Sequence, residues 1–143
     1  MLLGIICGVS LLFSPIIAAA EAEGLALVAH PPVQLNNTPR TYLNLFLMRQ
    51  TTDQQGDALT LFTLDPSTQA YEQFVSQCLH WNPRFLARRW QRSLFTGEGR
   101  TPNIVNDWKQ MQTQLLNTPS AIGYLPASLV QPPLMVLKRC QAL

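Results

Sequence analysis

Charged residues are scarce in this sequence, at 13% of 143 residues, and the formal net charge is only +2. A protein that neutralises nucleic-acid phosphates needs a concentrated basic surface with suitable partners around it. The densest cationic group is Arg84, Arg88, Arg89 and Arg92, and we expect no exposed aromatic side chains among its members. We interpret the group as a solvated helix face or a docking surface for a protein, and we expect no nucleic-acid partner.

The motifs of common enzyme classes are also missing. The sequence has no Gly-x-Ser-x-Gly elbow, no His-Glu-x-x-His and no phosphate-binding loop. Its carboxylates are scattered, and Asp65 and Glu72 are typical of residues that cap a helix and favour its dipole. His30, Cys78 and His80 lack the paired spacing of a zinc site. We therefore predict a protein that is not an enzyme and has no metal or cofactor.

Charge is absent from residues 1–20, which carry an apolar run followed by Ala18-Ala19-Ala20. This pattern predicts a signal peptide, residues 1–20, with cleavage after Ala20 or Ala22, although the basic start of such a segment is missing. A retained membrane anchor is the alternative, but Ser14-Pro15 interrupts the run. We expect a periplasmic protein without a stable membrane span.

Cysteine is rare, with three residues, and Cys7 falls in the predicted signal peptide. In an oxidising compartment Cys78 and Cys140 could form a disulfide that ties the C-terminal tail to a helix. Two separate thiols are the alternative, because the sequence gives no distance between them.

Residues 23–143 are expected to form a single α/β domain. Short apolar runs predict strands at 25–29, 58–64, 121–125 and 134–137. Cap and proline signals predict helices that start near Pro39, after Thr68 and at Pro83. Apolar residues at helical spacing from Ile104 to Leu115 predict a fourth helix. This order predicts a mixed, mostly parallel sheet flanked by helices.

Two segments resemble a known family. Phe95-Thr96-Gly97-Glu98-Gly99 with Pro102 resembles the FTGxGxxP segment of short phosphate ABC-transporter substrate-binding-like proteins, and Ala121-Ile122-Gly123-Tyr124 resembles their IGY strand. The resemblance covers residues 23–143 in order. It implies the fold of one lobe of a type II periplasmic binding protein, for which this chain has the length.

The resemblance implies a phosphate-like ligand, but the ligand turn differs. The larger receptors use an Arg-x-Asp-Gly-Ser-Gly-Thr-like turn before a helix. Counted back from Phe74, Thr68 takes the place of the first serine, Leu64 that of the arginine and Pro66 that of the aspartate. The arginine is therefore missing, and Gln69 stands where the glycine after that serine would be.

The candidate oxyanion-binding residues are Ser67 and Thr68 at a helix start, helped by Thr38 and Arg100. Helix capping is the alternative role of the hydroxyls, and a turn after a helix explains the glycines before Arg100. We expect a periplasmic solute-binding domain for phosphate, linked to ABC-type transport. The alternative is a degenerate binding-protein fold that serves as an envelope interaction or assembly module. The sequence does not define its oligomeric state.

Overall fold

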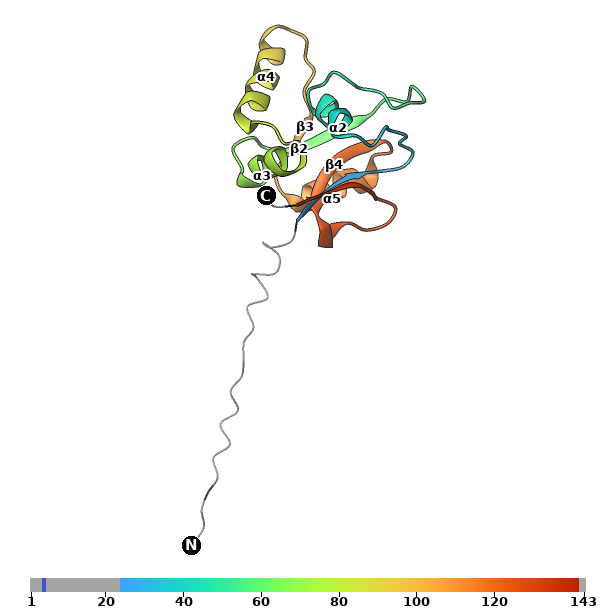
Figure 1. The fold of residues 1–143 in the computed structure, drawn as a ribbon, viewed down its shortest axis with the longest axis vertical. Coiled ribbons are helices and arrows are strands. Elements are labelled where there is room, and N and C mark those ends of the chain that lie inside the picture. Colours follow the sequence, from blue (N-terminus) through green and yellow to red (C-terminus); the bar gives the residue numbers. More distant parts are fainter. Residues whose placement is uncertain (1–3, 5–23, 142–143) are drawn as a thin grey trace.

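The computed structural model describes Gly4 and residues 24–141. Residues 24–141 fold into a mixed β-sheet with helices on both faces (Figure 1). The predicted signal peptide and its cleavage sites lie outside these residues. None of the helices in residues 24–141 combines the length and the apolar character that a membrane crossing requires. The elements are β1 (Leu25–Ala29), α2 (Pro39–Phe46), β2 (Thr60–Leu64), α3 (Gln69–Cys78), α4 (Pro83–Phe95), β3 (Asn103–Val105), α5 (Trp108–Asn117), β4 (Ala121–Pro126), the 3-10 turn η1 (Ala127–Leu129) and β5 (Met135–Cys140).

The sheet has the strand order β3-β2-β4-β1-β5. β2 pairs in parallel with β3 and β4, whereas β1 lies antiparallel between β4 and β5. In this sheet β2, β3, β4 and β5 therefore point the same way, and β1 runs against them. The predicted mixed, mostly parallel sheet is confirmed. All of β1 is buried, because strands flank it on both sides and helices cover the faces of the sheet.

Neighbouring residues of β4 show how the two faces are covered. Successive side chains of a strand point to opposite faces. Tyr124 stacks on Phe74 of α3, with ring centroids 3.7 Å apart. At Gly123 an added Cβ would lie 2.9 Å from Met111 Sδ of α5. Helices α3 and α5 therefore pack on opposite faces, and a side chain at position 123 would have to displace the Met111 side chain of α5.

The helix starts follow the capping signals in the sequence. Thr38 and Thr68 cap α2 and α3 with their hydroxyls, and Asn82 caps α4 with its amide oxygen. Pro39 and Pro83 occupy the first turn of their helices, where the absent N–H costs no hydrogen bond. The predicted starts near Pro39, after Thr68 and at Pro83 are confirmed.

The prediction for the fourth helix was wrong at its start. Ile104 belongs to the short strand β3, which pairs with β2, and Asn103 Nδ2 donates to Leu61 O at 3.1 Å. Helix α5 begins only at Trp108, because Asp107 Oδ1 accepts a hydrogen bond from Gln110 N at 2.8 Å and caps it. A strand of this length has too few residues to show an alternating pattern, so the sequence did not predict it. The described sheet therefore has five strands, one more than the predicted four.

Candidate functional site

The turn between β2 and α3 holds the hydroxyls that the sequence suggested for an oxyanion. Thr68 Oγ1 donates to Asp65 O at 2.7 Å and accepts from Tyr71 N at 3.2 Å. Ser67 N donates to Asp65 Oδ1 at 2.8 Å. Hydrogen bonds from the Ser67 side chain and backbone hold the pKa of Asp65 below its ordinary value. A carboxylate of the protein thus already accepts hydrogen bonds from the turn that leads into this helix.

Tyr124 fixes the strand end behind this turn. Its hydroxyl accepts from Leu64 N at 2.9 Å and lies 3.0 Å from Thr63 Oγ1. Burial raises the pKa of Tyr124 far above its ordinary value, so the phenol stays neutral. Leu64, which stands in the place of the receptor arginine, is itself buried. Sequence reasoning singled out Tyr124 only as part of a motif and missed this anchoring role.

Thr38 has a local role at the start of α2. Its hydroxyl accepts from Thr41 N at 3.2 Å and lies 2.9 Å from Thr41 Oγ1. This is the geometry of a helix cap.

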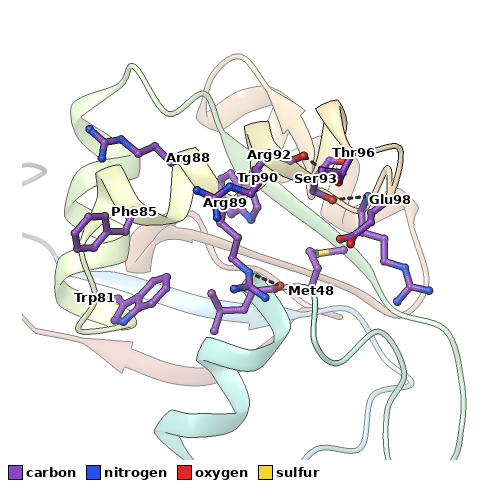
Figure 2. A pocket seen from close by; sticks show the side chains of 12 residues that line it. Met48, Trp81, Phe85, Arg88, Arg89, Trp90, Arg92, Ser93, Thr96 and Glu98 are labelled. Carbon is purple, nitrogen blue, oxygen red and sulfur yellow. Dashed lines mark hydrogen bonds between the residues drawn. The ribbon is translucent and has the colours of Figure 1, made fainter.

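An open groove of about 890 Å³ lies between α4 and the C-terminal end of α2 (Figure 2). We call it the arginine groove, because its polar lining includes Arg88, Arg89, Arg92 and Arg100. Glu98 is the one acidic residue among the described lining residues. The side chains of these arginines are exposed. The groove therefore presents an excess of positive charge to solvent.

Helix α4 is held so that its arginines face outward. Trp90 Nε1 donates to Phe46 O at 2.8 Å, and Leu86 is fully buried. These two residues fix the inner face of the helix. On the outer side Arg89 Nε donates to Leu47 O at 3.4 Å and reaches across to the end of α2 (Figure 2).

The glycine-rich loop after α4 folds back onto the helix and places Arg100. Gly99 N donates to Ser93 O and Arg100 N to Ser93 Oγ, each at 3.2 Å. Gly97 and Gly99 have φ angles of +77° and +64°, which glycine adopts without the strain of a Cβ. The glycines thus form a turn after the helix, which was one of the two alternatives predicted from the sequence. This turn brings Arg100 to the groove.

The four candidate binding residues are not brought together in this groove. Arg100 lines it, whereas Thr38, Ser67 and Thr68 are not among the lining residues. Sequence reasoning missed the aromatic side of the groove. The expectation that no exposed aromatic accompanies the arginines was wrong, because Phe85 is 57% exposed and lines the groove with Trp81. The position of Phe85 directly after Arg84 was the feature of the sequence that could have indicated this exposed aromatic side chain.

Cys78 and Cys140 are joined by a disulfide, with their Cα atoms 4.8 Å apart. The bond ties the end of α3 to the edge strand β5. Lys138 Nζ donates to Cys78 O at 3.1 Å beside it. In residues 24–141 no group of three or more His, Cys, Asp or Glu side chains has an arrangement that could hold a metal ion.

Comparison with known proteins gives matches in structure alone. No family model and no curated protein sequence matches the chain. The structure is similar to an ABC-type phosphate transport receptor from Vibrio cholerae, with a TM-score of 0.51, 16% identity, and coverage of 80% of this chain and 45% of the receptor. The fold is that of a phosphate-receptor lobe. The resemblance seen in the sequence is thereby confirmed for the fold.

Two other solved structures agree with this result. A substrate-binding protein assigned to phosphate ABC transport, from Clostridium perfringens and solved with bound phosphate, has a TM-score of 0.54, 15% identity, and coverage of 81% of this chain and 44% of its own. PstS from Borrelia burgdorferi also has a TM-score of 0.54 and 15% identity, with coverage of 72% and 40%. The chain spans less than half the length of these receptors.

Proposed function

We propose that this protein is an exported binding domain without catalytic chemistry, which recognises an anionic partner in the cell envelope through the arginine groove. The observation that carries the proposal is the gathering of Arg88, Arg89, Arg92 and Arg100 around one hollow with Glu98 as its acidic side chain. Guanidinium groups bind carboxylates and phosphates through two parallel hydrogen bonds, and a cleft of one charge sign concentrates ions of the other. Two similar solved structures are a transport receptor and a substrate-binding protein, which supports a binding role.

Capture of phosphate at the start of α3, in the service of ABC-type transport, is the second candidate. The similar solved structures favour it, since one is a phosphate transport receptor and another was solved with bound phosphate. Ser67 and Thr68 lie at that helix start, but the Asp65 carboxylate accepts a hydrogen bond from Ser67 N there. A phosphate at this place would meet a negative charge, so the arginine groove is the better anion site.

Export to the periplasm is part of the proposal. The apolar segment that ends in Ala18-Ala19-Ala20 supports it. The bond between Cys78 and Cys140 also supports it, because disulfides persist in oxidising compartments.

Titration calorimetry with propane-1,2,3-tricarboxylate and with inorganic phosphate tests the two candidates. The proposal expects the tricarboxylate to bind, and the double variant Arg88→Gln/Arg92→Gln to weaken it about tenfold by loss of two ion pairs. The variant Arg40→Gln/Arg84→Gln changes the net charge equally at exposed positions that do not line the groove, and it should retain the wild-type affinity.

The opposite result is well defined. If phosphate binds more tightly than the tricarboxylate, and if Thr68→Ala abolishes that binding while the arginine variant keeps it, the second candidate is correct. Absence of saturable heat from either anion at millimolar concentration contradicts both.

A further inference from the structure

The arginines of the groove are spaced along a helix rather than clustered at one point. Arg88 and Arg92 are four residues apart on α4, so their Cα atoms are separated by about 6 Å along the helix axis. Arg89 is already engaged with the Leu47 carbonyl at the end of α2. A single tetrahedral anion can accept paired hydrogen bonds from one or two such groups. The spacing therefore favours a ligand that carries several negative charges in a row.

An extended polypeptide has charges at this spacing. Residues two apart in a strand point to the same side and are separated by about 6.6 Å. Carboxylates at alternate positions thus match the repeat of about 6 Å on α4. Between Phe85 and Thr96, both of which line the groove, the helix rises by about 16 Å, which is the length of about five extended residues.

The two ends of the groove differ in chemistry (Figure 2). Trp81 and Phe85 lie at one end, and Phe85 is 57% exposed although it is a large apolar side chain. Thr96 and Glu98 lie at the other end. An apolar side chain of a ligand is stabilised at the aromatic end, where its surface is removed from water. The groove thereby distinguishes the two ends of a bound segment.

We infer that the arginine groove binds an extended segment of a partner protein, about five residues long, with carboxylates at alternate positions and an apolar residue at one end. The inference rests on the proposed function and names the chemistry of its partner. Recognition of acidic segments by arginine clusters and recognition of extended chains are both established modes of peptide binding.

Two labelled hexapeptides of equal composition test the spacing by fluorescence anisotropy. The first, Leu-Glu-Thr-Glu-Thr-Glu, alternates its carboxylates, and the second, Leu-Glu-Glu-Glu-Thr-Thr, groups them. We expect the alternating peptide to bind at least fivefold more tightly at low salt, and its binding to weaken as salt rises. Equal affinity of the two peptides, or tighter binding of the grouped one, overturns the inference.

Matched variants test the place of binding. Arg88→Gln and Arg92→Gln should each weaken the alternating peptide about threefold, and the charge reversal Arg92→Glu more than tenfold, because exposed ion pairs are individually weak. Arg84→Gln lies on the same helix outside the groove and should change the affinity less than twofold. Equal losses in Arg84→Gln and Arg92→Gln place the peptide elsewhere and overturn the inference.

Other outcomes separate this inference from the proposed function. Tricarboxylate binding that depends on Arg88 and Arg92, without binding of either peptide, contradicts the inference alone. The chain has its own alternating pair, Glu21 and Glu23. If sedimentation shows a dimer that Arg92→Gln disrupts, the occupant is a second copy of this chain and the partner-protein inference is wrong.

Discussion

The start of α3 and the outer face of α4 are both polar, but they differ in how far their polar side chains are hydrogen-bonded within the protein. At the start of α3, the Asp65 carboxylate accepts from Ser67, and Thr68 makes two hydrogen bonds within the turn. Along α4, four arginines surround one groove with one carboxylate, Glu98, among the described lining residues. A helix start can thus be a closed structural unit, while the groove beside the next helix keeps its charged side chains exposed to solvent.

The largest expected effect concerns the anchor of α3. The disulfide between Cys78 and Cys140 joins residues 62 apart in sequence, and its loss should lower the free energy of unfolding by about 4 kcal/mol in the chain-entropy model. Urea denaturation of Cys78→Ser/Cys140→Ser measures this change. A reductant should lower the stability of the wild-type protein to that of the variant and leave the variant unchanged. A loss below about 1 kcal/mol contradicts the anchoring role.

A smaller loss is expected where β4 holds the end of β2. Tyr124→Phe keeps the ring that stacks on Phe74 but leaves the buried Leu64 N–H without its acceptor. We expect a loss of about 1–3 kcal/mol, the cost of an unsatisfied buried donor. Tyr42→Phe removes the hydrogen bond to Leu137 O at a less buried hydroxyl and serves as the control, with an expected loss of about 1 kcal/mol. Equal losses in the two variants contradict the special role of Tyr124.

Removal of the cap of α3 separates a structural from a binding role. Thr68→Ala should lower the free energy of unfolding by about 1 kcal/mol, and Thr38→Ala at the start of α2 by a similar amount. Thermal denaturation checks the stabilities, and the affinity for tricarboxylate should stay unchanged in both. A selective loss of anion affinity in Thr68→Ala would show that the start of α3 is a binding site.

The smallest effect concerns pH. The pKa of Asp65 is lower in the folded protein than its ordinary value of 3.8, since Ser67 hydrogen-bonds to the carboxylate. Its contribution to stability is therefore present above pH 3.8 and is lost as the pH falls through the lowered folded pKa. Asp65→Asn should show a shallower loss of stability in that acid range than the wild-type protein, as measured by urea denaturation at each pH. Identical pH dependence contradicts the closed turn.

The fold could be predicted from the sequence to a large extent, because its signals are local. Thr38-Pro39 and Asn82-Pro83 start helices by short-range capping, and buried strands such as 25–29 are continuous apolar runs. The short strand β3 escaped prediction, since its pairing with β2 is a long-range contact. Leu94 lies at helical spacing from the buried Leu86 and Trp90 but is 61% exposed, because periodicity does not say how far a helix extends beyond the core.

The candidate site could be predicted only in its parts. The arginine group and Arg100 were both visible in the sequence. Their meeting in one groove depends on a loop that folds back through Gly97 and Gly99, and on the packing of Trp90 against the end of α2. The hydrogen bond that the Asp65 carboxylate accepts from Ser67 N could not be predicted either. A carboxylate near a helix start gives the same sequence pattern whether it caps the helix or closes a turn.

Nuclear magnetic resonance of the ¹⁵N-labelled protein during titration with propane-1,2,3-tricarboxylate tests most directly whether anion recognition lies on α4. We predict saturable shifts of the Trp81 indole N–H and of the amides of Arg88 to Arg92, with the amides of Gln69 and Ala70 at the start of α3 unchanged. Saturable shifts at Gln69 and Ala70, with the α4 signals unchanged, would contradict this prediction.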